Sequence, residues 1–120
     1  MFKSLELFRM AQGLAQHAAA RQSAVARNLA NVDTPGYRQR DIPDFAEAWR
    51  AAGREGLGGS GPFSPLREQA VRGARPDPNG NTVSLEGEML KSAQIRQQHE
   101  MAMAVYKSAL SQLRSTLGRR

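Results

Sequence analysis

The sequence contains no cysteine and only two histidines among its 120 residues. The absence of cysteine excludes disulfides, thiolate zinc sites and cysteine nucleophiles. His17 lies in a run of alanines with no carboxylate on its helical face, and His99 falls on an expected helix-packing seam. Both positions favour an interfacial, hydrogen-bonded histidine over a catalytic base. The sequence therefore predicts no catalytic residue, no metal site, no cofactor and no enzymatic activity.

Large apolar side chains are scarce as well. Leu, Ile, Val and Phe supply only 22 of the 120 residues, which is below the roughly 20% under which charged chains tend towards disorder. We therefore expect helices that are weak alone and better ordered when packed against other chains. No segment approaches the roughly 18 apolar residues of a transmembrane helix. Because Lys3, Glu6 and Arg9 interrupt the first apolar run, no cleavable signal peptide is expected either.

Glycine and proline are concentrated in the middle of the chain. Residues 33–81 hold all 6 prolines and 8 of the 11 glycines, a density typical of flexible segments. The sequence thus divides into an N-terminal amphipathic helix at 1–32, a turn motif with a flexible middle at 33–81, and a C-terminal amphipathic helix at 82–120. Within the middle, the cluster at 56–61 lacks the Lys-Ser/Thr ending of a phosphate-binding loop and is interpreted as a linker.

Both terminal segments show apolar residues at the three- and four-residue spacing of helix seams. We therefore predict an all-α fold in which two long terminal helices pair as an antiparallel coiled-coil hairpin. The first seam consists of Leu7, Leu14, Val25 and Leu29, with Ala11 and Ala18 between them and Val32 after Leu29. The second consists of Ile95, Tyr106, Leu110, Leu113 and Leu117, with His99 and Ala102 between them.

Several local signals fix where these helices begin and end. Ser84 can cap the second helix, and Gly118 is a suitable stop. A turn is expected at 78–80, where Pro, Asn and Gly follow one another. After Pro43, the spacing of Phe45 and Trp49 predicts one or two amphipathic turns, either a short packing helix or a patch that docks a partner.

The most informative stretch is NLANVDTPGY, residues 28–37. Pro35 fixes φ at the second position of a turn and Gly36 accepts a positive φ at the third, so residues 34–37 predict a type II β-turn. Asn31 or Asp33 can bond local backbone where the helix unwinds. An ordinary helix stop would need only one of these features, so Asn28 and Tyr37 call for a further explanation.

This segment closely resembles the N-terminal signature of the axial proteins of the bacterial flagellum, the rod and hook family. Their N-x-A-N-x-x-T-P-G-Y pattern is matched here by Asn28, Ala30, Asn31, Thr34, Pro35, Gly36 and Tyr37. Residues 80–89, GNTVSLEGEM, and residues 38–45, RQRDIPDF, are more similar to the proximal rod proteins of the FlgB family than to the related FlgC family. Gly87 departs from the pattern, because a charged residue is common at this position in the family.

The resemblance implies a structural subunit of the proximal rod of the flagellar basal body. It implies export to the periplasm through the flagellar type III apparatus and assembly through the terminal helices into a tube. The implied partners are other rod proteins, the membrane-ring protein, the rod-to-ring adaptor and the export apparatus, in a homo- and hetero-oligomer.

The alternative is a small helical nucleic-acid-binding protein, which a net charge of +6 and a pI near 10.8 suggest. Against it, the basic residues of the first helix are spread along its length, and no recognition helix or aromatic platform accompanies them. We therefore expect no nucleic-acid partner. A binder would shift the mobility of a duplex and lose affinity steeply as salt rises.

Overall fold

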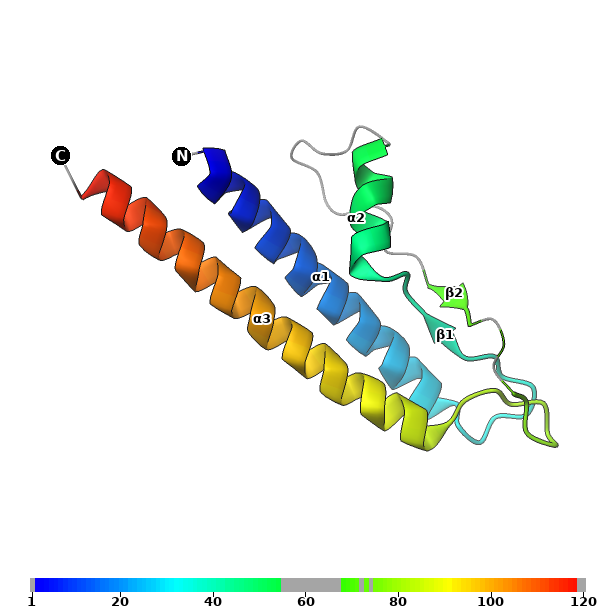
Figure 1. The fold of residues 1–120 in the computed structure, drawn as a ribbon. Helices are drawn as coiled ribbons and strands as arrows, with labels where there is room; N and C mark the ends of the chain where they lie inside the picture. The colour runs from blue at the N-terminus through cyan, green and yellow to red at the C-terminus, as the bar shows by residue number, and fades with distance from the viewer. Residues whose placement is uncertain (1, 55–67, 72, 74, 119–120) are drawn as a thin grey trace.

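The computed structural model describes residues 2–54, 68–71, 73 and 75–118. Two long helices run side by side in opposite directions, so that both ends of the chain lie at the same end of the molecule (Figure 1). These are α1, Phe2–Ala30, and α3, Leu85–Leu117. The molecule is elongated, with extents of 67 × 29 × 18 Å. The predicted all-α antiparallel hairpin of terminal helices is confirmed.

The contact between the two helices is built from small residues at seven-residue intervals. In α3 the buried residues are Glu88, Ile95, Ala102 and Ala109. In α1 a similar row of Ser4, Ala11, Ala18 and Val25 is buried, beside Gly13, His17, Ala24 and Asn28. The apolar cluster at the centre of this seam joins Ala18, Val25 and Ile95, with Leu29 packed against it. Because alanine buries little area, the helices approach closely but gain only a modest free energy per residue.

The larger seam residues expected from the sequence lie around this alanine row. Val25 and Ile95 are buried, whereas Leu7, Leu14, Leu29, Leu110 and Leu113 are half-buried. Tyr106 is 39% exposed and Leu117 58% exposed. His99 is exposed, so its expected interfacial burial is wrong for the fold of the single chain. The reason is that Ala102 and Ala109 face α1, which turns His99 and the residues from Tyr106 to Leu117 towards one flank of the hairpin.

The predicted cap at Ser84 and the predicted stop at Gly118 are confirmed, and α3 itself lies within the predicted segment 82–120. The Ser84 side chain accepts a hydrogen bond from the Gly87 N–H at 3.2 Å, as an N-cap should. At the other end, the Gly118 N–H donates to the Arg114 carbonyl at 2.8 Å. Gly118 keeps a right-handed φ of −76°, so this stop does not depend on the left-handed freedom of glycine.

The middle of the chain forms a small layer beside α1 (Figure 1). It contains the strands β1, Arg40–Asp41, and β2, Gln69–Ala70, which pair antiparallel with Arg40 opposite Ala70. In the sequence, the helix α2, Phe45–Arg54, comes between the two strands. The strand pair was not expected from the sequence. The predicted linker at residues 56–61 lies outside the described residues.

The helix α2 packs on α1 at a glycine. A Cβ atom on Gly13 would lie 3.1 Å from Cζ3 of Trp49, so the missing side chain makes room for the indole. One turn further along α1, the His17 ring meets Phe45 edge-on at a centroid distance of 5.7 Å. The packing-helix interpretation of Phe45 and Trp49 is therefore confirmed. Among the described residues, no helix is both long and apolar enough to cross a membrane.

Candidate functional site: the junction of two sequence motifs

The turn at residues 34–37 has the predicted geometry. The Tyr37 N–H donates to the Thr34 carbonyl at 3.3 Å, and Gly36 has a φ of +75°. Both features are those of a type II β-turn. Just before it, Asn31 folds back on the helix end, because its side-chain amide donates to the Arg27 carbonyl at 2.8 Å. Its Oδ1 accepts from the Thr34 hydroxyl at 3.2 Å, which ties the end of α1 to the turn.

A second turn, ahead of α3, lies directly against the first. The Gly80 N–H donates to the Asp77 carbonyl at 2.8 Å, and Gly80 has a φ of +84°. The two turns meet at their glycines, because a Cβ on Gly80 would lie 3.4 Å from the Cα of Gly36. The Gly36 N–H donates to the Asn79 carbonyl at 2.9 Å. The two segments that resemble the axial family therefore form one structural unit at the closed end of the hairpin.

Asn28 holds the outgoing chain against α1. Its side chain is fully buried, and its Nδ2 donates to the Arg40 carbonyl at 2.7 Å. Its Oδ1 accepts from the Arg40 N–H at 3.1 Å and from the Tyr37 hydroxyl at 3.2 Å. A side-chain amide thus pairs with both backbone groups of one residue, as a neighbouring strand would. This accounts for the asparagine and the tyrosine that an ordinary helix stop left unexplained.

Asn81 closes the end of α1 from the other motif segment. Its side chain is 1% exposed, and its Nδ2 lies 2.8, 3.0 and 2.7 Å from the carbonyl oxygens of Asn31, Val32 and Thr34. Its Oδ1 accepts from the Val83 N–H at 2.7 Å. Carbonyls at a helix end lack partners within the helix. A residue 50 positions away in the sequence therefore satisfies the backbone where α1 unwinds.

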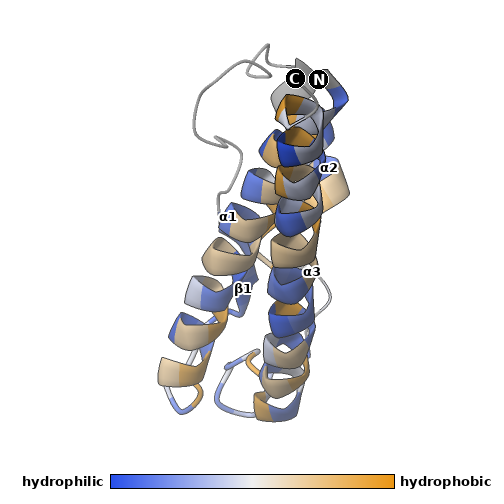
Figure 2. Cartoon of the chain, turned by 90° about the vertical axis from the view of Figure 1, so that its left-hand side faces the viewer, coloured by the Kyte–Doolittle hydropathy of each residue, from blue (hydrophilic) through white to orange (hydrophobic). Residues whose placement is uncertain are grey.

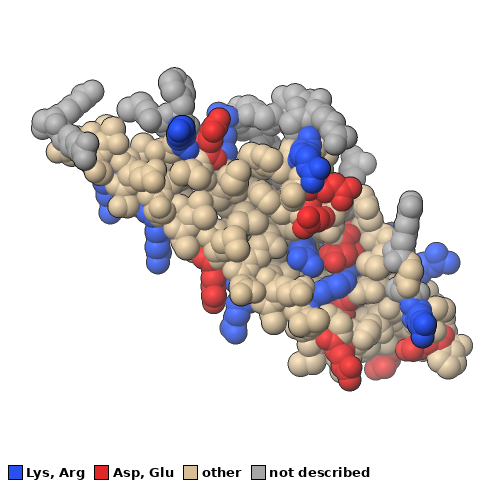
Figure 3. Space-filling model, viewed as in Figure 1, with Lys and Arg blue, Asp and Glu red and all other residues tan. Residues whose placement is uncertain are grey.

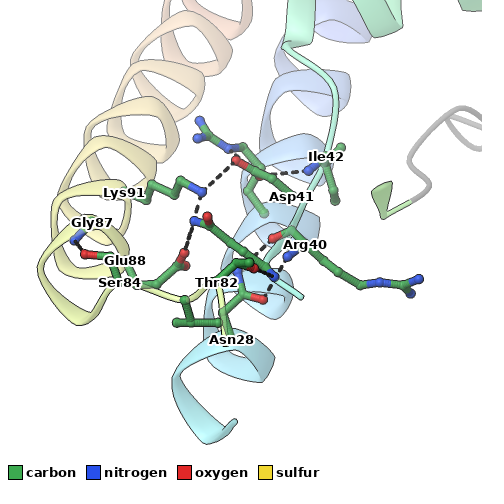
Figure 4. A network of polar contacts seen from close by, with 12 residues as sticks. Asn28, Arg40, Asp41, Ile42, Thr82, Ser84, Gly87, Glu88 and Lys91 are labelled. Atoms are coloured by element: carbon green, nitrogen blue, oxygen red, sulfur yellow. Dashed lines mark hydrogen bonds and ion pairs between the residues drawn. The ribbon is translucent and has the colours of Figure 1, made fainter. Parts of the chain in front are cut away.

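A chain of charged and polar groups continues from the junction to α3 (Figure 4). Glu88 is fully buried, and its Oε1 accepts from the Gln39 side-chain amide and lies 3.5 Å from the Lys91 ammonium. Lys91 also lies 3.3 Å from Asp41, which in turn pairs with Arg21 at 3.4 Å. Glu88 Oε2 is buried without a partner among the described residues. Glu88 therefore links α3 to Gln39, the residue before β1, and through Lys91 to Asp41 of β1.

A smaller polar contact joins α1, α3 and the segment just before α2 further along the hairpin. The buried His17 donates through Nε2 to the Pro43 carbonyl at 2.6 Å, and its Nδ1 accepts from the Gln98 amide at 2.8 Å. The same amide donates to the Leu14 carbonyl at 3.2 Å. His17 is thus an interfacial, hydrogen-bonded histidine, as the sequence indicated.

The junction brings together five of the seven predicted motif residues. Asn28, Asn31, Thr34, Gly36 and Tyr37 are linked by the hydrogen bonds described above. Ala30 and Pro35 are exposed beside them. Sequence reasoning gave no buried role to Gln39, Asn81 or Glu88, although all three are buried. Asn81 and Glu88 lie within the second segment that resembles the family, residues 80–89. The position of Asn81 between a turn and a helix cap was the sequence signal that could have indicated its role.

The arrangement is suited to fixing geometry. Apart from Glu88 Oε2, the amides and carboxylates of the junction are occupied with backbone and with one another, and within the described residues no group of His, Asp or Glu could hold a metal ion. Two crossed glycine turns, a buried asparagine on each side and an ion-pair chain set the angle and register between α1, β1 and α3.

The chain is similar to known flagellar proteins. A family model described as flagella basal body rod protein matches residues 8–38, which end just after the first turn. The flagellar basal body rod protein FlgB of Salmonella typhimurium is 33% identical over 116 aligned residues, covering 82% of this chain and 83% of the relative. FlgB of Agrobacterium fabrum is 29% identical with 87% of each chain covered, and FlgB of Escherichia coli is 28% identical with 82% and 83% covered.

Proposed function

The chain belongs to the FlgB family and is a structural subunit of the flagellar basal body rod, and we propose that it occupies the proximal part of that rod in the periplasm. We further propose that it arrives there through the flagellar type III export apparatus. The comparisons give no support to the nucleic-acid-binding alternative, because all of them lead to rod proteins.

The composition of the helix seam supports export in an unfolded state. A hairpin held by alanines and by few large apolar residues is easy to unfold and refold. The absence of cysteine means that no disulfide can form to obstruct passage. In this proposal, stability is gained at the destination, where neighbouring subunits cover apolar side chains that one chain leaves exposed.

We propose distinct roles for the three segments of the chain. The terminal segments 1–32 and 82–120 make the contacts between subunits through their helices. The segment 33–81 determines how the layer of β1, β2 and α2 leaves the hairpin. The motif residues Asn28 to Tyr37 then act through geometry, with the buried Asn28 as the residue that fixes β1 on α1.

The partners proposed for the chain follow from this place in the basal body. They are further copies of the chain, other rod proteins, the membrane-ring protein and the rod-to-ring adaptor, with the export apparatus as a transient partner. The role proposed for the chain is structural and not catalytic. The observation that carries the proposal is the similarity to FlgB over most of the chain, joined to a hairpin in which both resembling segments form one junction.

The test is to delete the gene in the bacterium that encodes the chain and to complement it with a tagged copy. We expect the deletion to abolish swimming and rod completion, and the tagged chain to copurify with isolated basal bodies. Gly36→Asn serves as a matched variant that keeps the turn, and it should restore most swimming.

Recovery of the tagged chain in the cytoplasm, bound to nucleic acid in a salt-sensitive manner, would contradict the proposal. Export is tested separately, by measuring the tagged chain outside the cytoplasm in strains with and without an active type III apparatus. Equal amounts in both strains would show that another route delivers it.

A further inference from the structure

The C-terminal half of α3 carries a second apolar row in addition to the one that meets α1. We call it the outer stripe, and it consists of Met103, Tyr106, Leu110, Leu113 and Leu117. Its spacings of 3, 4, 3 and 4 residues keep these side chains on one face of a helix. The row that meets α1 is different, because there Ala102 and Ala109 are fully buried. The outer stripe is only partly covered, with Leu117 58% exposed and Met103 39% exposed.

The outer stripe and Gln98 lie on opposite flanks of the alanine row that faces α1, because Tyr106 follows Ala102 by four positions and Gln98 precedes it by four. On one flank, Gln98 of α3 bonds His17 of α1, which contacts Phe45 of α2. On the other flank, Tyr106 meets Phe8 of α1 edge-on at a centroid distance of 5.2 Å. Leu110 and Leu113 follow Tyr106 on its side of α3. Within the described residues, the aromatic contact between the stripe and another element is the one with Phe8.

The period of the outer stripe identifies the shape of what covers it. Apolar residues alternating at three and four positions are the seam of a helix that packs against another helix. The alanine row already serves α1, so a second seam on the same helix calls for a further helix. The stripe ends at Leu117, the last residue of α3, and lies at the open end of the hairpin (Figure 2). A helix can lie along it there without crossing the junction.

Charge next to the stripe identifies the chemistry of that helix. Lys107 and Arg114 each follow a stripe residue by one position, where coiled coils carry the charges that select partners. Neither forms an ion pair with any described residue, and residues 103–118 contain no acid. Figure 3 shows mainly basic side chains, with an acidic one among them, along the edge of α3 that faces away from α1. A covering helix with acidic residues beside its apolar seam fits this border.

A second copy of the chain does not offer such a helix within the described residues. Its α1 contains a single acidic residue, Glu6, and four basic ones. Pairing of two outer stripes would bring Lys107 and Arg114 against the same two cations of the other copy, which is unfavourable. The apolar residues of α2, Phe45 and Trp49, are directed at α1.

We propose that the outer stripe docks an acid-flanked amphipathic helix of a different protein, and that it is not a self-association surface. This inference rests on the proposed function, in which other rod proteins are among the partners of the chain. To that function it adds which surface of the chain binds a partner, that the partner is helical, and that the partner's flanking charge is negative.

The test uses the full chain and two synthetic helical peptides of about 21 residues, each with leucine along a heptad seam. One peptide carries Glu at the flanking positions and the other carries Lys. Binding is measured by fluorescence anisotropy of the labelled peptides at about 0.05 M and about 0.5 M salt. We expect the Glu-flanked peptide to bind at least about tenfold more tightly at low salt, with most of the difference lost at high salt.

Charge reversal supplies the matched variants. Lys107→Glu combined with Arg114→Glu should reverse the preference between the peptides. Arg38→Glu combined with Arg75→Glu changes the net charge equally at the closed end of the hairpin and should leave the preference unchanged. Circular dichroism measures whether the charge-reversed variant keeps its helix content. If it does not, Lys107→Gln combined with Arg114→Gln replaces it, and this variant should remove the preference between the peptides.

Three results would overturn the inference: equal binding of both peptides, no binding of either, or self-association of the chain that Leu110→Asp abolishes. The last would make a second copy the occupant. None of these results bears on whether the chain is found in isolated basal bodies, so a failure here is distinct from a failure of the proposed function.

Discussion

The side-chain amide of Asn81 lies 2.8 Å from the carbonyl oxygen of Asn31, across 50 positions of the sequence. This contact joins the segment that precedes α3 to the end of α1, so each helix end is defined partly by residues of the other. The first consequence concerns substitution of Asn81 itself. Asn81→Ala leaves the Val32 carbonyl and the buried Val83 N–H without their side-chain partner, and each such group costs about 1 to 3 kcal/mol.

We therefore expect Asn81→Ala to lower the free energy of unfolding by about 2 to 4 kcal/mol, measured by urea denaturation followed by circular dichroism. Asn81→Asp should cost at least as much, because it places a carboxylate against the carbonyls. The control is Gln12→Ala on the exposed face of α1, which should change stability by less than about 0.5 kcal/mol. A loss for Asn81→Ala no larger than that of the control would contradict the role given to this amide.

Asn28 and Tyr37 should differ sharply when each is replaced by its nearest relative. Asn28→Asp keeps Oδ1 but turns the donor to the Arg40 carbonyl into an acceptor, so we expect a loss of about 2 to 3 kcal/mol. Tyr37→Phe removes one bond of 3.2 Å and keeps the ring, so we expect about 0.5 to 1 kcal/mol. The same denaturation measurement compares them. Equal losses for the two variants would show that the buried amide does not hold β1.

Substitutions at Gly36 separate backbone conformation from packing. The space around its missing side chain is open, and its φ is +75°. Gly36→Asn should therefore be tolerated, since asparagine adopts positive φ, whereas Gly36→Val should be severely impaired in rod completion and swimming. Export of both variants is measured in the same strains. Identical behaviour of the two, with normal secretion, would mean that the motif acts through side-chain contacts and not through the turn.

Gly13→Ala tests how α2 docks. The added methyl group would lie 3.1 Å from the Trp49 ring, so the indole must move, although alanine favours the helix by up to about 1 kcal/mol over glycine. Trp49 is the single tryptophan of the chain. We expect its fluorescence to shift to longer wavelength while the helix content stays equal or rises. An unchanged emission spectrum would show that α2 is not seated on Gly13.

The hairpin and its ends could be predicted because their signals are local. Ser84, the turn at residues 34–37 and the heptad spacing each act within a few positions of the chain. The pairing of β1 with β2 could not, since two residues per strand leave no periodic pattern. The buried role of Glu88 also depends on Gln39, which is distant in sequence.

The seam of α3 shows where periodicity alone is ambiguous. Large residues from Tyr106 to Leu117 form an apolar row, but Ala102 and Ala109 form another one next to it. Counting hydrophobicity favours the larger side chains, whereas close packing against the alanines of α1 favours the smaller ones. The sequence pattern therefore located an apolar row on α3, and the structure distinguishes the face that meets α1 from the outer stripe.

A subnanometre density map of basal bodies purified from the bacterium that makes this chain tests the account most directly. We expect the map to show α1 and α3 as two adjacent helices in the proximal rod, joined at one end by the contacting turns of residues 34–37 and 77–80. We also expect a helix of another protein along the outer stripe. Absence of the chain from the rod, or α1 and α3 separated with the junction open, would contradict it.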